Sequence, residues 1–293
     1  MLNAHGGLMK LVKRLVMVGV LLVVLVIIGV FAGLYYVNDL VKVGVERGGT
    51  YAMGVKTSLG SADVGVFSGK AGLKDLGVAN PEGFKGKEFF ALGTAAVEVS
   101  LGSLRGDIVE IPKLELSMVR ATLEKKDGKT NYKVILDNLA KLKTGKADQP
   151  QPAGGEKKFV IKDLEIKDVR VTVDLLDSPV PLGSIVVPIE RIHLTDLGTA
   201  GKGLPMSDIV AIVVRAVLAT AAENGNGLIP ADMLGDLQGQ LAMLGDLSQL
   251  GVKLEAVVAK ELVDKAKAEA DKALNKVQDE VGKQIDKGIK DIF

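Results

Sequence analysis

The apolar residues of this chain follow several patterns, and the first of them predicts a membrane span. Leu15 to Val37 is an apolar stretch without a charged residue. A helix of about 20 apolar residues crosses a bilayer core about 30 Å thick, so this stretch is long enough. Lys10, Lys13 and Arg14 precede it, and the first charge after it is Asp39. This asymmetry predicts a cytoplasmic N-terminus, with the bulk of the chain on the other side of the membrane.

A cleaved signal peptide is the alternative for this stretch. The apolar region of a signal peptide is normally about 7–15 residues long and ends at a small-x-small cleavage site. The stretch here is longer, and its end, Phe31 to Tyr36, matches such a site poorly. A retained anchor is therefore preferred. Within it, Gly29 and Gly33 form a G-x-x-x-G pair, a possible transmembrane helix contact at which two helices can approach closely, although glycine is common in membrane helices.

Beyond the span, alternating apolar and polar residues predict half-buried strands. The alternation is clear around Leu114 and Leu116 and again from Phe159 to Val173, and frequent glycines between residues 44 and 77 disfavour helix there. Three segments echo one another weakly, which is typical of one long, repeat-like antiparallel sheet. These segments are Gly72–Val78, Val160–Ile166 and Arg191–Leu197.

Helical spacing of apolar residues returns in three places. Thr130 to Leu142 predicts a helix with Asn131 as its N-cap, and Pro205 to Ala222 predicts an apolar helix that covers the sheet. From Pro230 the chain reads as amphipathic helix to its end. The apolar face of this last region is a candidate for self-association or for packing onto the sheet, with packing and self-association together preferred over a membrane surface. Its residues include Leu237, Leu241, Leu244, Val277, Val281 and Ile285.

These patterns together predict an α+β protein. A twisted antiparallel, repeat-like sheet is covered by helices, an N-terminal transmembrane helix precedes it, and a long C-terminal amphipathic helix follows it. The expected organisation is a basic cytoplasmic stub (residues 1–14), the transmembrane helix (15–37), a β-rich extracytoplasmic domain (38–203, with a linker at about 144–157) and a helical C-terminal region (204–293).

The amino-acid composition limits the kinds of catalytic and binding sites that the chain can form. The chain has 293 residues, no Cys, two His and a net charge of +1. The absence of Cys excludes thiolate nucleophiles and Cys-ligated metals, and the near-neutral charge disfavours nucleic-acid binding. No nucleophile elbow, Walker A or zinc-protease motif occurs, and His193 reads as a surface or edge residue of a strand. The expectation is therefore no enzyme, with no catalytic residue, no cofactor and no metal site.

Two segments give the chain a resemblance to a known family. Pro112-Lys113-Leu114-Glu115-Leu116 is a strand, and Leu123 to Tyr132 combines a strand, a charged residue, an Asp-Gly turn and an Asn followed by an aromatic residue. This arrangement, with Ile161 to Val173 as a further repeat, resembles the AsmA-like proteins of bacterial envelopes over roughly residues 10–200. The resemblance implies a sheet with an apolar-lined groove and a role in lipid transfer or envelope homeostasis.

Two functions from different classes follow from these expectations. The first is a membrane-anchored, periplasmic lipid-binding or lipid-transfer protein of the bacterial inner membrane. The second is a non-enzymatic structural or scaffolding protein that self-assembles through its C-terminal helix. The partners implied are membrane lipid, a second copy of the chain and other envelope proteins, with no nucleic acid. The groove is the feature that separates the two, because an ordinary core results if the Pro205–Ala222 helix covers the apolar face completely.

Overall fold

The computed structural model describes residues 36–143, 157–175, 184–201, 203–225, 229–243 and 252–258, and single helical positions between 264 and 279. Most of the predicted membrane span, up to residue 35, and nearly all of the predicted linker lie outside these residues. Among the residues that are described, no helix is long and apolar enough to cross a membrane. The chain divides into two units, Met1–Val41 and Lys42–Phe293, and the second contains the fold described below.

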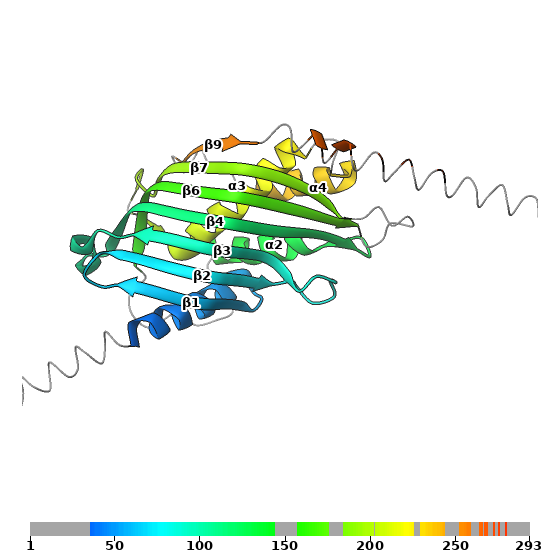
Figure 1. Ribbon diagram of the computed structural model, residues 1–293. Coiled ribbons are helices and arrows are strands. Elements are labelled where there is room, and N and C mark those ends of the chain that lie inside the picture. Colours follow the sequence, from blue (N-terminus) through cyan, green and yellow to red (C-terminus); the bar gives the residue numbers. More distant parts are fainter. Residues whose placement is uncertain are drawn as a thin grey trace, which may run out of the picture. The chain divides into compact units, whose positions relative to one another are not determined.

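The second unit is an α+β structure built on a large mixed sheet of nine strands (Figure 1). Seven strands follow the order β1-β2-β3-β4-β6-β7-β9, while β5 pairs with β4 and β8 pairs with β6. The strands are β1 Thr57–Gly65, β2 Lys70–Ala79, β3 Glu88–Glu98, β4 Ile108–Lys126, β5 Lys129–Thr130, β6 Lys158–Leu175, β7 Ile185–Leu197, β8 Leu204–Pro205 and β9 Lys253–Val257. The helices are α2 Asn131–Lys143, α3 Met206–Asn224 and α4 Ala231–Met243, with a short 3-10 helix η1 at Leu101–Arg105 and a first helix that includes residues 36–53.

The prediction of an entirely antiparallel sheet is wrong at its centre. β4 and β6 pair in parallel, from Ile108 opposite Lys158 to Lys125 opposite Leu175. After β4 the chain turns through β5 and enters α2, which carries it back toward the end of the sheet where β4 began. A helical crossover is the usual connection between parallel neighbours, whereas a tight turn joins antiparallel ones.

The expected long helix from Pro230 to the chain end is also interrupted. Residues 231–243 form α4, but Lys253–Val257 form β9, which pairs antiparallel with β7. The segment Lys253-Leu254-Glu255-Ala256-Val257 alternates polar and apolar residues over too few positions to outweigh the helical spacing around it. Its strand conformation comes from the edge of β7, which offers backbone partners that local propensity does not show.

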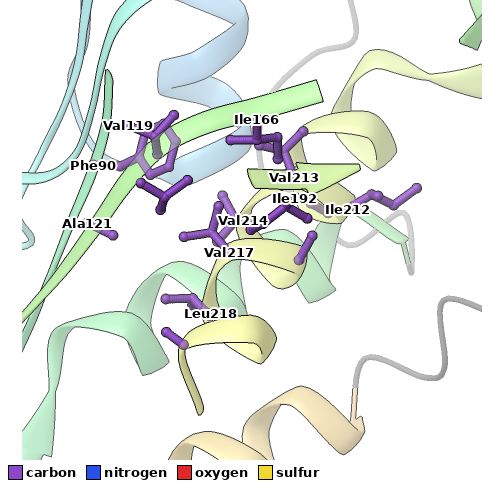
Figure 2. Close-up of a cluster of buried hydrophobic side chains, with 14 of the residues drawn as sticks. Phe90, Val119, Ala121, Ile166, Ile192, Ile212, Val213, Val214, Val217 and Leu218 are labelled. Atoms are coloured by element: carbon purple, nitrogen blue, oxygen red, sulfur yellow. The ribbon is translucent and has the colours of Figure 1, made fainter. Parts of the chain in front are cut away.

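Helices cover the apolar face of the sheet. α3 packs against β6 and β7, and α2 packs against β4. Figure 2 shows Ile166 of β6 and Ile192 of β7 among the α3 side chains, together with Phe90 and Val119 from the neighbouring strands. Twelve residues of α3 are buried, so this helix lies inside the core. Residues on both sides of the expected boundary at 203–204 therefore share one core, as the sequence predicts for a helix that is apolar nearly all round.

In the middle of the sheet, the strands interrupt the rule that every second residue is buried. We call the line of these interruptions across the sheet the crease. In β4, Leu116 is followed by Val119, and in β6, Ile166 is followed by Val169, so buried residues three apart interrupt a spacing of two. One residue at the crease is in the left-handed region on each of three strands. These residues are Asp75 (φ 55°), Met118 (φ 58°) and Asp168 (φ 52°).

The registers align these positions across the sheet. Between the flanking pairs, Asp75 stands opposite Gly60 and Gly93, and Met118 stands opposite Gly93. A Cβ atom at Gly93 would lie 2.9 Å from the Cβ of Met118, and one at Gly60 would lie 2.9 Å from the Cβ of Asp75. A side chain at either glycine would therefore be crowded, because the left-handed residue of the neighbouring strand places its own side chain directly above.

Candidate interaction surface

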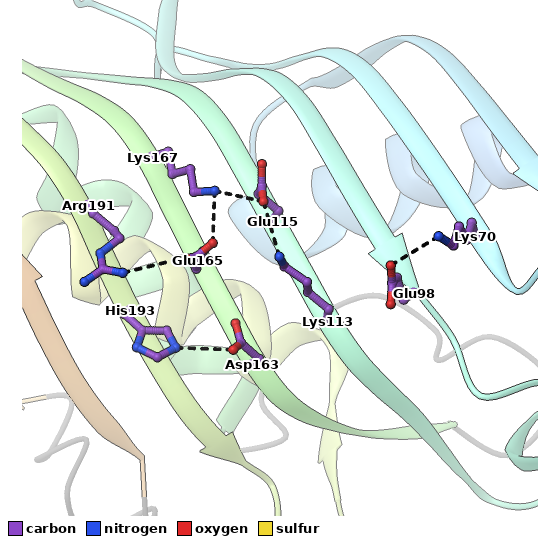
Figure 3. Close-up of polar contacts among 9 residues, drawn as sticks. All are labelled: Lys70, Glu98, Lys113, Glu115, Asp163, Glu165, Lys167, Arg191 and His193. Atoms are coloured by element: carbon purple, nitrogen blue, oxygen red, sulfur yellow. Dashed lines mark hydrogen bonds and ion pairs between the residues drawn. The ribbon is translucent and has the colours of Figure 1, made fainter.

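The face of the sheet away from the helices carries charged side chains in an ordered arrangement (Figure 3). On either side of the crease, strand alternation directs every second residue outward. Lys113 and Glu115 of β4 point to this face, as do Glu165 and Lys167 of β6 and Arg191 of β7. We call this surface, with Lys70, Glu98, Asp163 and His193, the outer face.

Opposite charges on the outer face form a continuous chain of contacts. Lys167 Nζ lies 2.9 Å from Glu115 Oε2 and 3.0 Å from Glu165 Oε2, so it bridges β4 and β6. Arg191 Nη1 lies 3.5 Å from Glu165 Oε1 and extends this series of ion pairs to β7. At the other end of the series, Lys113 Nζ lies 3.7 Å from Glu115 Oε2. The hydrogen bond from Lys167 lowers the pKa of the Glu165 carboxyl, and the hydrogen bonds to Glu115 and Glu165 raise the pKa of the Lys167 ammonium.

His193 is part of the outer face, as its place in an alternating strand predicts. Its Nε2 lies 3.5 Å from Asp163 Oδ2. The register pairs His193 with Glu165 and Asp163 with Thr195, so His193 and Asp163 are diagonal neighbours on adjacent strands. The part of the chain that the structure describes contains no cluster of three or more His, Cys, Asp or Glu side chains that could hold a metal ion. The arrangement can offer charge pairs to a binding partner.

Glu124 and Asn131, two residues of the Leu123–Tyr132 segment that contributes to the AsmA-like resemblance, take part in a buried polar clamp at the C-terminal end of β4. Glu124 is 1% exposed because the β2–β3 loop, residues 80–87, folds over it. Its carboxylate accepts hydrogen bonds from the side chain of Asn80 (2.7 Å) and from the backbone N–H groups of Lys85 (2.8 Å) and Gly86 (2.9 Å). Three donors satisfy a buried carboxylate that would otherwise be costly.

Asn131 completes this clamp, although the sequence predicted a different role for it. Its Oδ1 accepts a hydrogen bond from the backbone N–H of Glu124 (2.9 Å), and its Nδ2 donates to the carbonyl of Thr122 (2.8 Å) and to Asn80 Oδ1 (2.9 Å). The predicted N-cap is thus the first residue of α2, and its side chain joins β4 to the β2–β3 loop. This part of the motif therefore holds the β2–β3 loop against β4.

A cleft of about 500 Å³ lies beside the clamp, between the β4–β5 turn, α2 and α4. The hydroxyl of the buried Tyr132 donates to Asp236 Oδ2 at 2.9 Å, and Lys125 pairs with Asp232 one turn earlier on α4. Burial and the hydrogen bond to Asp236 raise the pKa of Tyr132, and the hydrogen bond from Lys125 lowers the pKa of Asp232. The first contact attaches α4 to α2, and the second attaches it to β4.

The structure describes only part of the predicted contact residues. Leu237 is 1% exposed in the core of the Lys42–Phe293 unit, and Leu241 is half-buried against the same core. The other predicted contact residues lie outside the described residues: Gly29, Gly33, Leu244, Val277, Val281 and Ile285. Sequence reasoning found the apolar spacing of α4 and placed Lys113 and Glu115 on the polar side of their strand, but it did not predict the ion pairs that link the strands of the outer face.

Comparison with protein families and with curated proteins finds no match. No protein-family model matches the chain, and no curated protein matches it with significant similarity. The likeness to the AsmA-like proteins therefore stays a prediction from the motifs.

Proposed function

We propose that this chain is a membrane-anchored, non-enzymatic envelope protein that acts as a scaffold, binding another macromolecule through the outer face of its sheet. One observation carries the proposal: α2 and α3 cover the apolar side of β4, β6 and β7, so the accessible side of these strands is the charged one. A surface with ordered charges of both signs selects partners by complementary charge more than by apolar area. The membrane anchor is the predicted span at residues 15–37.

Lipid binding inside the sheet, which the family resemblance implies, requires α3 to leave its place. Ile212, Val214, Val217 and Leu218 of this helix are each at most 2% exposed. Exposing four such side chains costs roughly 6–12 kcal/mol, at about 1.5–3 kcal/mol for each. That cost is comparable to the whole stability of a typical domain, about 5–15 kcal/mol. The scaffold is therefore the function that the geometry supports better.

Photocrosslinking in membranes tests this proposal. A photoreactive amino acid replaces Ser117, a half-buried residue of the outer face on β4, and in a matched variant it replaces the exposed Val134 of α2. We expect Ser117 to yield a discrete protein adduct that disappears when Glu165→Lys is added, while position 134 does not yield it. An adduct of twice the chain mass identifies a second copy as the partner. Equal labelling from both positions would contradict the proposal.

A lipid assay distinguishes the alternative. The Lys42–Phe293 unit has its own core, so it is purified without detergent and extracted with organic solvent. We expect no stoichiometric phospholipid in the extract. One phospholipid per chain that survives purification would show that the sheet opens and would favour lipid transfer over the scaffold.

A further inference from the structure

Exposed apolar side chains gather at one end of the sheet, the end where β1 stops and where β4 and β6 begin. Thirteen large apolar side chains are exposed among the described residues, and six of them are at this end, while the opposite end has Val134 and Val186. Phe67, in the β1–β2 turn, is 84% exposed, the most of any in this group. The six residues are Val66, Phe67, Leu101, Leu104, Ile108 and Met206. We call this end the apolar tip.

Backbone hydrogen bonds hold the two main parts of the apolar tip together. The N–H of Val99 donates to the carbonyl of Gly69 at 2.7 Å, which joins the start of the η1 loop to the β1–β2 turn. Gly69 has φ 68° and lies so close to Leu101 that a Cβ there would be 3.3 Å from its Cγ. Phe67 and Leu101 are therefore presented by a shared, hydrogen-bonded framework. Scattered apolar side chains need no explanation, but a gathering of them marks an interaction site.

The helix at the start of the folded unit has its N-terminal end directed toward the apolar tip. Residues 42–53 form a helix antiparallel to β1: Lys42 donates to the carbonyl of Gly60 at 3.2 Å, and Thr50 accepts from the N–H of Thr57 at 2.9 Å. The N-terminal end of this helix thus points in the direction in which β1 runs, toward the β1–β2 turn. The predicted span ends at Val37, five residues before Lys42.

The length of β1 and the length of the segment that follows the predicted span decide whether the apolar tip can reach a bilayer. β1 extends about 17 Å from Gly60 to Gly65, at about 3.4 Å per residue. The five residues from Val37 to Lys42 cover about 8 Å as helix and at most about 18 Å when extended. If the predicted span crosses a bilayer, so short a segment would keep the apolar tip within reach of the bilayer surface.

We propose that the apolar tip docks into the interface of the bilayer that holds the chain's own anchor, with Phe67, Leu101 and Leu104 inserted among the lipid headgroups; this rests on the membrane anchor proposed above. Lys70, Arg105, Lys157 and Lys158 at this end are balanced by Asp63, Glu98, Asp107 and Glu110, so insertion depends on apolar contact and needs no anionic lipid. Interfacial side chains of this kind sit about 5–10 Å deep, at the boundary of headgroups and acyl chains. Docking would fix the sheet relative to the membrane and leave the outer face open to a partner.

A single tryptophan tests the docking, because the chain contains no Trp. The full chain with Phe67→Trp is reconstituted into phosphatidylcholine vesicles whose acyl chains are brominated near the headgroup. The matched control is Phe84→Trp, a half-buried aromatic residue in the β2–β3 loop at the other end of β2. We expect bromine quenching at position 67 to exceed that at position 84 by roughly twofold or more, as interfacial depth requires. Leu104→Trp is the second probe if Phe67→Trp does not fold.

The outcomes separate this inference from the function on which it rests. If the chain fails to float with the vesicles, the membrane anchor itself is wrong. If it floats but the tryptophans introduced at positions 67 and 84 are quenched equally, the anchor holds and the docking is overturned. If the control alone is quenched, the opposite end of the sheet faces the bilayer, which overturns the docking as well.

Discussion

The two faces of the sheet are made by the same strands, yet they differ in almost every physical respect. On the inner face, Ile166 and Ile192 are fully buried against α3. On the outer face, Lys167 and Arg191 stand in partial contact with water and pair with carboxylates. Burial of apolar area stabilises folds, whereas exposed ion pairs contribute little. The inner face therefore supplies most of the stability of the fold, and substitutions of charged residues on the outer face should leave the protein folded.

The largest expected effect is a core substitution on the inner face. Ile166→Ala removes a fully buried side chain that packs under α3, so we expect it to lower the free energy of unfolding by about 2–5 kcal/mol. Arg170→Ala changes an exposed residue of the same strand and should alter it by about 0.5 kcal/mol or less. Urea denaturation of both variants measures the contrast. Similar losses in the two variants would show that the faces do not differ as described.

Glu124 differs from the other charged residues of the sheet, because the β2–β3 loop has buried it. Glu124→Gln replaces one acceptor oxygen by an amide N–H, which leaves a backbone donor of Lys85 or Gly86 without its partner. We expect a loss of about 1–3 kcal/mol, the cost of a buried unsatisfied donor. Glu110→Gln, at an exposed position of the same strand, is the control and should have little effect in the same urea experiment.

Substitutions at the crease, which affects both faces of the sheet, should destabilise the fold less than the substitutions above. Gly93→Ala places a Cβ 2.9 Å from the Cβ of Met118, and we expect about 1–2 kcal/mol of destabilisation, toward the low end for overpacking because Met118 is exposed. Met118→Gly relieves both the contact and the left-handed backbone. The double variant should therefore be more stable than Gly93→Ala alone, and a double-mutant cycle measures the coupling. Additive effects would show that the two residues do not meet.

The elements with long, regular spacing could be predicted from the sequence. The helices at Thr130–Leu142 and Pro205–Ala222 correspond to α2 and α3 within a few residues. The strand alternation was also correct, but the step from Leu116 to Val119 and from Ile166 to Val169 was not recognised as a crease. Those two steps, at matching positions of neighbouring strands, are visible in the sequence once the registers are known.

Other features depend on contacts that no local pattern contains. The parallel pairing of β4 and β6 is decided by where α2 returns the chain, and β9 is decided by the open edge of β7. The clamp around Glu124 joins residues more than 35 positions apart, so its burial could not be inferred from the charged sequence Glu124-Lys125-Lys126. The ion pairs of the outer face could not be inferred for a similar reason, since they connect different strands.

The smallest expected effect concerns the outer face itself. Lys167 lowers the pKa of the Glu165 carboxyl in the folded chain, so the ionised form stabilises the fold. That stabilisation is present above the unfolded pKa of about 4.3 and is lost as the pH falls through the lower folded value. Glu165→Gln removes it, and we expect a loss of less than about 1 kcal/mol at pH 7, reduced further in 1 M salt. Unfolding free energies of the variant and the native chain should converge at acid pH, since both then have a neutral side chain at position 165; a gap that is unchanged by acid and by salt would assign the role of Glu165 to packing.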